Sequence, residues 1–367
     1  MTPDPGPSSI QVLDALEAVR RRPAMYFGDT GSMGLHHLVW EVIANSIDQH
    51  LAREATHLRV DVDDEGWITI EGDGPGIPTA PLRDGPRVLE DIFLRLHHGP
   101  SRFDHFPHVH VAPSMHGVGL AAVSAVCARL EVESRHRGEH WRAAFERGVM
   151  VEPARSIGPS ERSGTRIRML PDAQIFSNAR VDHALVEERL RELAWLCPLL
   201  AIRWQGTTLP GRGGPAGWVR EIAGDALLAG TLLSTTRDVD DVQVDLALGW
   251  TDRDETTVRS FVNFGATQRG THVRGVYAAL VAMARAVGSD ADARVVHELL
   301  LPGLVVVVHV GLFDASFGSP TRDHLVTPLA EVATRTAIER ALRVVLAPRS
   351  ALATFLRGRL GVGDAMT

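Results

Sequence analysis

An acid, an amide and a second acid recur at helical spacing near the start of this chain. Glu41, Asn45 and Asp48 stand at positions i, i+4 and i+7 of the segment 35–52, and most other positions of that segment are apolar. At 100° per residue, the three side chains form one narrow polar stripe on an otherwise apolar helix. A buried carboxylate needs a partner, which a nucleotide, a water molecule or a metal ion can supply. The alternative is a core helix whose polar groups bond to neighbouring backbone.

Glycine-rich turns beyond this helix favour the functional interpretation. Alternating and apolar runs predict strands and one further helix, and the turns stand at their ends. In chain order, the segments are the strands 58–62 and 67–70, the turn 72–78, the turn 114–119, the helix 120–130 and the strand 163–168. Such turns expose backbone N–H groups, which suit phosphate. Each turn alone is weak evidence, but the ordered set predicts a phosphate-binding site.

Two stretches carry a family resemblance. The opening segment, from Ser8 to Thr30, and the run GLHHLVWE that ends at Glu41 resemble the N-terminal region of the gyrase and topoisomerase IV B subunits. These proteins belong to the GHKL ATPases, with MutL, the heat-shock ninety chaperones and histidine kinases. The resemblance extends into the 340s. It implies an α+β fold, in which a GHKL (Bergerat) sandwich of a mixed sheet and helices precedes a smaller α/β transducer-like domain.

Four segments follow from this resemblance and from chain composition. We expect an N-terminal arm at 1–7, the ATPase domain at 8–210, the transducer-like domain at 217–350 and a C-terminal tail at 351–367. A Gly/Pro cluster between residues 209 and 217 marks the boundary between the domains. The second domain is expected to contain the strands 242–250, 259–264 and 304–312, the helix 276–286, and helical structure over 330–358 with a break at Pro348.

Composition agrees with a large, soluble, enzyme-like chain. It has 367 residues, of which 44% are hydrophobic and 23% charged, enough for two domains. Cys127 and Cys197 offer neither a disulfide framework nor metal-ligand spacing. No signal peptide opens the chain, and the most apolar run, 299–313, is too short to span a bilayer. We therefore expect a cytoplasmic protein without membrane contact. The net charge of −7 gives no general attraction to DNA.

The resemblance assigns roles to the polar stripe. Glu41 stands at the family's general base, which polarises the water that attacks the γ-phosphate. Asn45 stands at the magnesium-binding asparagine, and Asp48 is counted with the nucleotide site. ATP and Mg²⁺ are therefore the expected cofactors.

The resemblance also assigns residues further along the chain. They would contact the base, the phosphates or the mouth of the pocket. Asp73, Gly76, Ile77 and Thr165 belong to the base side, Arg135 to the mouth, His116, Gly117, Val118 and Gly119 to the phosphate turn, Arg102 to the lid, and Arg322 to a sensor loop of the second domain.

Several positions depart from the family pattern. Gly72 replaces the aspartate that accepts a hydrogen bond from the adenine amino group, and its neighbours Glu71 and Asp73 should point to the opposite face of the strand. Losing that charge-assisted bond should cost roughly 1.5–3 kcal/mol of binding free energy. Gln49 and Pro75 replace both members of an ion pair. In the sensor loop, Pro320 and Arg322 replace glutamine and lysine, and Arg322 keeps the positive charge.

Three lid histidines, His105, His108 and His110, raise the alternative of a metal site. No cysteine lies near them and no other segment offers an obvious further ligand. We therefore favour an exposed loop.

These observations predict an ATP-hydrolysing, gyrase-B-like region of the type II DNA topoisomerase kind. Two copies would close as a nucleotide-dependent homodimer, with gyrase subunits as partners and DNA bound through the assembly. No Glu-Gly-Asp-Ser-Ala motif of a TOPRIM domain occurs, so no DNA cleavage is expected from this chain alone. Two alternatives remain. One is a degenerate GHKL binding module with weak or no ATPase activity that acts on a gyrase or another partner, and the other is a MutL-like or chaperone-like ATPase. The gyrase-type opening segment argues against the latter.

Overall fold

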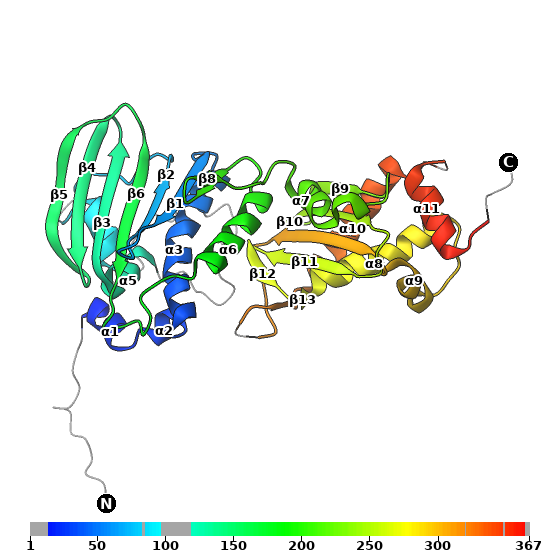
Figure 1. Ribbon diagram of the computed structural model, residues 1–367, viewed down its shortest axis with the longest axis horizontal. Coiled ribbons are helices and arrows are strands. Elements are labelled where there is room, and N and C mark those ends of the chain that lie inside the picture. The colour runs from blue at the N-terminus through cyan, green and yellow to red at the C-terminus, as the bar shows by residue number, and fades with distance from the viewer. Residues whose placement is uncertain (1–13, 83–84, 97–118, 320, 348, 364–367) are drawn as a thin grey trace, which may run out of the picture. The chain divides into compact units, whose positions relative to one another are not determined.

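The computed structural model describes residues 14–82, 85–96, 119–319, 321–347 and 349–363 (Figure 1). These residues fall into two compact units. The first contains the described residues up to 96, together with 119–186 and 203–207, and the second contains 187–202 and 208–363. Each unit has its own sheet and its own helices, so the α+β class predicted from the sequence is confirmed.

An eight-stranded sheet organises the first unit, with strand order β5-β4-β3-β6-β2-β1-β7-β8. The pairs from β5 to β1 are antiparallel. The strands are β1 (His57–Val62), β2 (Ile68–Gly72), β3 (Cys127–His136), β4 (Glu139–Glu146), β5 (Val149–Pro159), β6 (Gly164–Pro171), β7 (Ala201–Trp204) and β8 (Thr207–Thr208). The helices are α1 (Ala15–Arg21), α2 (Ala24–Phe27), α3 (Ser32–Leu51), α4 (Val88–Leu94) and α5 (Gly119–Val126). Helix α6 (His183–Leu196) begins in the first unit, and most of its residues belong to the second.

Burial alternates along the central strands of this sheet. In β2, Ile68, Ile70 and Gly72 are buried, whereas Thr69 and Glu71 are partly exposed. Because successive side chains point to opposite faces, only one face of the sheet is covered here. Helix α3 contacts β2 on the covered face. Its apolar circumference explains this burial, and the prediction of a buried helix with a narrow polar stripe is confirmed.

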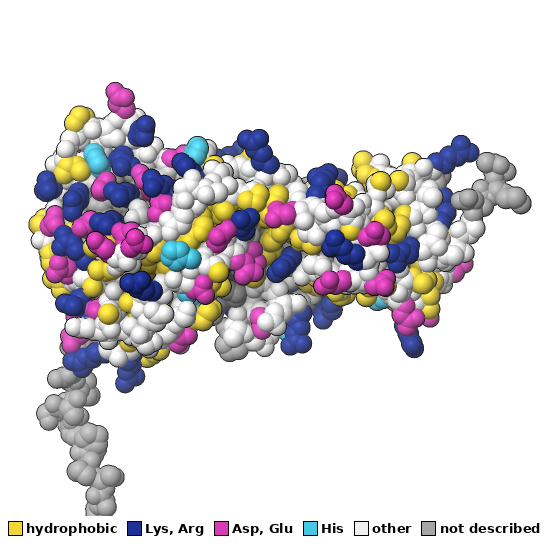
Figure 2. Space-filling model, viewed as in Figure 1, with side chains coloured by type: hydrophobic (Ala, Val, Ile, Leu, Met, Phe, Trp, Pro, Cys, Tyr) yellow, Lys and Arg dark blue, Asp and Glu magenta, His cyan; other side chains and the backbone are white. Residues whose placement is uncertain are grey.

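The other face carries charged side chains in register across the strands. Glu71 on β2 stands opposite Arg166 on β6, and Arg166 stands opposite Glu133 on β3. Figure 2 shows basic and acidic side chains interspersed over β3 to β6. Alternating signs keep like charges apart between neighbouring strands.

One predicted element was wrong at its end. The helix expected over 120–130 ends at Val126, and Cys127 begins β3. The backbone N–H of Asp172 donates to the Val126 carbonyl at 3.0 Å, while Cys127 to Leu130 pair with β6. The apolar spacing of this segment fits either a helix or a buried strand, so periodicity alone does not locate the change.

A five-stranded sheet of order β12-β11-β14-β10-β9 organises the second unit. β11 and β14 are parallel, and the other pairs are antiparallel. The strands are β9 (Leu233–Val239), β10 (Val242–Trp250), β11 (Thr257–Val262), β12 (Gly265–Thr267) and β14 (Leu304–Gly311), and β13 (Arg269–Gly270) pairs separately with β15 (His324–Leu325). The helices are α7 (Gly214–Ala223), η2 (Gly224–Ala226), α8 (Thr271–Ala286), α9 (Ala293–Leu300), α10 (Pro328–Val345) and α11 (Ala351–Leu360).

The centre of this second sheet is buried on both faces, unlike the first sheet. All eight residues of β14 are buried. Helices α8 and α10 share a core with one face, and α7 contacts β10 and β14. The helical segment predicted over 330–358 is divided into α10 and α11, as the proline suggested. None of the helices in the described part of the chain is both long and apolar enough to cross a bilayer.

Candidate functional site

The polar stripe of α3 meets the first residue of α5. The backbone N–H of Gly119 donates to the Glu41 Oε2 atom at 3.1 Å, although 78 residues separate the two in the chain. Gly119 has a φ of +78°, a left-handed conformation that glycine adopts without steric penalty. The N–H groups at a helix start carry partial positive charge and have no intrahelical partner. The proposed base and the expected phosphate-binding helix start are therefore neighbours.

Asp48 lies two turns along the same stripe. Burial raises the pKa of its carboxyl to about 7, and the negative charge of Glu41 contributes to the same shift. A carboxyl with this pKa is partly protonated at neutral pH, so charge on one acid of the stripe affects the other.

Asn45 is suited to a hard cation. Its Nδ2 atom donates to the Glu41 carbonyl at 2.9 Å, and its side chain is exposed. With the amide nitrogen bonded inside the helix, the Oδ1 atom is an oxygen of the type that Mg²⁺ prefers as a ligand. The described residues contain no group of three or more His, Cys, Asp or Glu that could hold a metal ion. Phosphate oxygens and water would therefore have to complete the coordination of Mg²⁺ at Asn45.

A second group of residues lies where β2, β6 and β3 stand side by side. Gly72 is opposite Thr165, and Thr165 is opposite Ser134. Opposed residues point to the same face, here the face that α3 covers. A Cβ atom built on Gly72 would lie 3.4 Å from the Ser46 Oγ atom of α3. We call Ser46, Gly72, Ser134 and Thr165 the Gly72 cluster.

The hydroxyl groups of this cluster differ in their bonding. Ser134 is fully buried, and its Oγ atom donates to the Ile77 carbonyl at 2.7 Å. The Thr165 Oγ1 atom is also buried, but it has no hydrogen-bond partner among the residues that the structure describes. A buried hydroxyl without a partner costs free energy, which a ligand or a water molecule can recover.

The turn after β2 packs closely against β3. Gly76 has a φ of +77°, and a Cβ atom there would lie 2.3 Å from the Arg135 carbonyl oxygen. The turn is also tied to β3 by a contact of 2.8 Å between His136 Nδ1 and the Pro75 carbonyl. Gln49 packs against this turn, because a Cβ atom on Gly74 would lie 2.1 Å from its Oε1 atom. Gln49 thus packs against the turn that contains Pro75, where the resembled family has an ion pair.

Asp73 does not join the Gly72 cluster. Its carboxylate accepts from the Thr56 and His57 backbone N–H groups, both at 2.8 Å, and from the Thr56 hydroxyl at 2.6 Å. Burial by itself raises the pKa of Asp73, but hydrogen bonds from Thr56 and His57 outweigh burial and lower it to about 2. The carboxylate therefore holds the start of β1.

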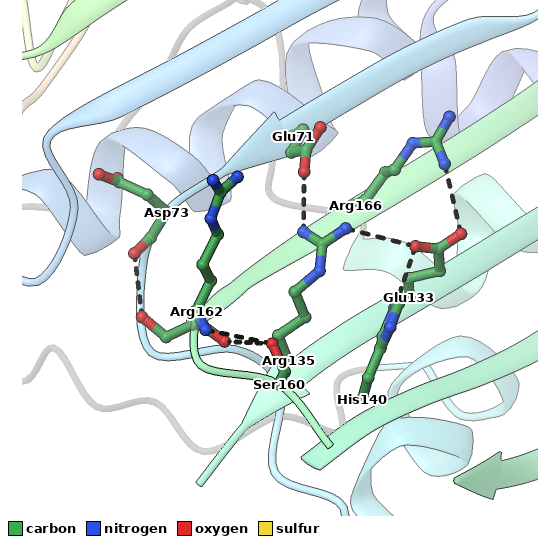
Figure 3. Close-up of polar contacts among 9 residues, drawn as sticks. Glu71, Asp73, Glu133, Arg135, His140, Ser160, Arg162 and Arg166 are labelled. Atoms are coloured by element: carbon green, nitrogen blue, oxygen red, sulfur yellow. Dashed lines mark hydrogen bonds and ion pairs between the residues drawn. The ribbon is translucent and has the colours of Figure 1, made fainter. Parts of the chain in front are cut away.

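Arg135 lies on the charged face of the sheet. Its Nη1 atom donates to Glu71 Oε1 at 2.8 Å, and its Nη2 atom lies 3.5 Å from Glu133 Oε2 (Figure 3). Glu133 also contacts Arg166 at 3.3 Å and His140 at 3.1 Å. Glu71 and Arg135 thus bond to each other on the face opposite Gly72, as strand alternation predicted for Glu71.

In the second unit, Arg322 lies in a compact loop. Its φ of +54° is uncommon for a residue other than glycine. The Arg322 N–H donates to the Ser319 carbonyl at 3.1 Å, and its guanidinium carbon lies 5.8 Å from the centre of the Phe317 ring. Partial burial lowers the pKa of Arg322.

Other predicted site residues lie outside the described residues. They are Arg102, His116, Gly117 and Val118, together with the lid histidines His105, His108 and His110 and the sensor-loop residue Pro320. Ser46, Thr56 and His57 are not among the residues that the sequence predicts for the site. Their positions in the chain gave no signal, because only the sheet register and the packing of α3 bring them to Gly72 and Asp73.

Two family models match the chain. The model described as "Histidine kinase-, DNA gyrase B-, and HSP90-like ATPase" matches residues 30–175, and the model described as "DNA gyrase B" matches residues 214–357. Among curated proteins, the DNA gyrase B protein of Thermotoga maritima is 33% identical over 86% of the chain and 53% of its own length. The DNA gyrase B protein of Thermus thermophilus is 33% identical over 95% of the chain and 58% of its own length. The chain thus spans somewhat more than half the length of these relatives.

Solved structures agree over nearly the whole chain. The 43K ATPase domain of Thermus thermophilus gyrase B, in complex with an aminocoumarin, superposes with a TM-score of 0.80 at 28% identity, covering 96% of this chain and 95% of that one. The gyrase B protein from Myxococcus xanthus superposes with a TM-score of 0.77 at 26% identity, covering 94% and 99%.

Proposed function

Because the chain belongs to the gyrase B family of GHKL ATPases, as its N-terminal ATPase and transducer region, we propose that it binds Mg²⁺–ATP and hydrolyses it. The hydrogen bond between Gly119 N–H and Glu41 Oε2 is the observation that carries this proposal. It supports a γ-phosphate at the start of α5 within one water molecule of a carboxylate. That is the arrangement that general-base attack by water requires.

In this proposal Glu41 orients and deprotonates the attacking water. Asn45 holds Mg²⁺, which neutralises charge on the phosphate oxygens. Gly119 binds phosphate with the backbone of His116, Gly117 and Val118. Asp48 influences the charge on Glu41.

Other residues in the proposal surround the nucleotide or come from the second unit. Gly76, Ile77 and Thr165 line the base side. Arg322 supplies a positive charge to the phosphates. Arg102 is a further basic contact from the lid. Asp73 and Arg135 act indirectly, because Asp73 holds β1 in place and Arg135 buttresses the end of β2 through Glu71.

We further propose that two copies close on nucleotide as a gate within a type II topoisomerase. The chain spans 53% and 58% of two gyrase B relatives, so partner gyrase subunits and DNA belong to this proposal for the complete assembly. In this proposal the ATPase and transducer region supplies nucleotide-driven closure, and it supplies no DNA cleavage.

Nucleotide turnover by the purified chain tests the proposal. Wild type should release phosphate from ATP only with Mg²⁺, and Glu41→Ala should abolish release while binding ADP as wild type does. Glu65→Ala, which changes an exposed glutamate in the turn between β1 and β2, is the matched control and should keep full turnover. Wild-type turnover by Glu41→Ala would show that another group is the base. Absence of any nucleotide binding would overturn the proposed function.

Gly72 favours a second candidate function, a module that binds nucleotide without turning it over. The base side lacks the family's carboxylate, and weaker positioning of ATP slows chemistry. In that case wild type and Glu41→Ala would bind nucleotide equally and neither would release phosphate.

A further inference from the structure

We propose that the Gly72 cluster reads the nucleobase with neutral hydroxyl groups and water, so that the site accepts 6-oxopurine nucleotides as well as 6-aminopurine nucleotides. This rests on the proposed function, since it assumes that the base of a bound nucleotide reaches the ends of β2 and β6. It adds the substrate class of that site: a purine nucleotide whose 6-substituent is either an amino or a carbonyl group.

The first argument is the chemistry of the groups that face the cluster. The Cβ direction of Gly72 points toward Ser46 Oγ, 3.4 Å away, and Thr165 stands directly opposite Gly72 with a buried Oγ1 atom that has no partner in the described chain. A serine or threonine hydroxyl donates one hydrogen bond and accepts others. Both groups therefore suit a donor such as an amino group and an acceptor such as a carbonyl oxygen.

The second argument is that neighbouring carboxylates are committed elsewhere. Asp73 accepts four short contacts from Thr56 and His57, between 2.6 and 2.9 Å. Glu71 accepts from Arg135 at 2.8 Å on the opposite face of the sheet. On α3, Asp48 is two residues from Ser46, or 200° around the helix, so it faces another direction.

The third argument is the absence of a carboxylate at Gly72. A carboxylate at this position only accepts hydrogen bonds, so it selects an amino group and repels a carbonyl oxygen. Gly72 removes that repulsion, and in this proposal a water molecule bridges the base to the Ser46 and Thr165 hydroxyls. A bridging water reorients to serve either 6-substituent. Discrimination between the two bases is therefore lost, while the phosphate contacts are unaffected.

Equilibrium binding of ADP and IDP, each with Mg²⁺, tests the proposal on the whole chain. These diphosphates differ at the purine 6-position and are not substrates for hydrolysis, so base choice is measured apart from turnover. We expect wild type to bind the two within about threefold. Gly72→Asp should bind ADP about 10- to 100-fold more tightly and IDP no better than wild type, because it restores an acceptor that favours only the amino group.

Gly72→Asn is the matched control. It has nearly the same size as aspartate, but its amide both donates and accepts. It should therefore bind ADP and IDP with affinities that remain within about threefold of each other. This result separates the effect of the carboxylate charge from the effect of side-chain size. Thr165→Val should weaken both nucleotides by a similar factor of about 3–10, because it removes a hydroxyl shared by both bases.

The outcomes separate this inference from the proposed function. If wild type prefers ADP over IDP by about 100-fold or more, another group reads the base, so the inference is wrong and the proposed function stands. If Gly72→Asp folds and binds both diphosphates as wild type does, Gly72 does not face the base and the inference is also wrong. If wild type binds neither ADP nor ATP, the proposed function fails and the inference fails with it.

Discussion

The two ends of the candidate nucleotide site are built from different chemistry. At the phosphate end, Glu41 and Asp48 are acids on one helix, and Glu41 bonds to the start of α5. At the base end, the Gly72 cluster contains hydroxyl groups and a glycine, and nearby acids are held by other partners. The phosphate end therefore depends on charge, whereas the base end depends on packing and on neutral hydrogen bonds. We therefore expect phosphate and metal contacts to contribute more to nucleotide affinity than contacts to the base.

We expect the largest effect from a substitution of Glu41 at the phosphate end. Glu41→Gln keeps the size and one hydrogen-bond acceptor of the side chain but cannot take a proton. General-base catalysis contributes about 10²- to 10⁴-fold, so phosphate release should fall by at least about 100-fold. Single-turnover phosphate release beside ADP titration measures both properties. A variant that loses binding and turnover in equal proportion would assign Glu41 to binding rather than to chemistry.

The second effect concerns Asp48 and stability. Its pKa is raised to about 7, so the folded state binds a proton that the unfolded state has lost from about pH 4 upward. The free energy of unfolding should therefore fall as pH rises through this window and level off above pH 7. Asp48→Asn should remove this pH dependence. Its free energy of unfolding relative to wild type should therefore be about 2–3 kcal/mol higher at pH 8 than at pH 5. Urea denaturation of both proteins at both pH values tests this prediction. An equal change in unfolding free energy between pH 5 and pH 8 in the two proteins would contradict it.

The third effect concerns the turn at the base end. Gly76→Ala places a Cβ atom 2.3 Å from the Arg135 carbonyl oxygen at a φ of +77°, so the turn must move. The control, Gly138→Ala, has a similar φ of +84° but no atom within 4 Å of the added Cβ. Gly138→Ala should cost about 1 kcal/mol and Gly76→Ala about 2 kcal/mol more. Thermal unfolding compares them, and equal losses would show that the turn tolerates the contact.

The smallest effect tests the role of Asp73. Its pKa is lowered to about 2, so its hydrogen bonds to Thr56 and His57 stabilise the fold above about pH 4, and this contribution is lost as pH falls toward 2. Because the carboxylate is partly exposed, solvent screening reduces the contribution to about 1 kcal/mol. Asp73→Asn should lose about that much stability at pH 7 and keep ADP affinity within about threefold. A large loss of ADP affinity in a stable variant would show that Asp73 contributes directly to binding of the base.

Much of the fold was predictable because the spacing of apolar and polar residues along the chain indicates helices and strands. The strand predicted at 242–250 matches β10, and the stripe of Glu41, Asn45 and Asp48 lies on one long buried helix. Helical and strand periods are properties of the backbone, so spacing along the chain is sufficient to assign a face. The wrong helix end at Val126 shows the limit, since an apolar segment satisfies both periods until a partner strand pairs with it.

Individual site residues were predictable from the sequence, but their contacts with distant segments were not. The sequence alone determined that Glu41 and Asp48 share a stripe, that Gly72 has no side chain to offer a base, and that Glu71 points away from it. Only the tertiary structure decided that Gly119 reaches Glu41, that Ser46 faces Gly72, and that Thr56 and His57 hold Asp73. These contacts depend on strand order, on register and on how α3 packs on β2. Residues that are distant in sequence become neighbours only when the sheet forms, because local backbone geometry does not specify which distant segments pair.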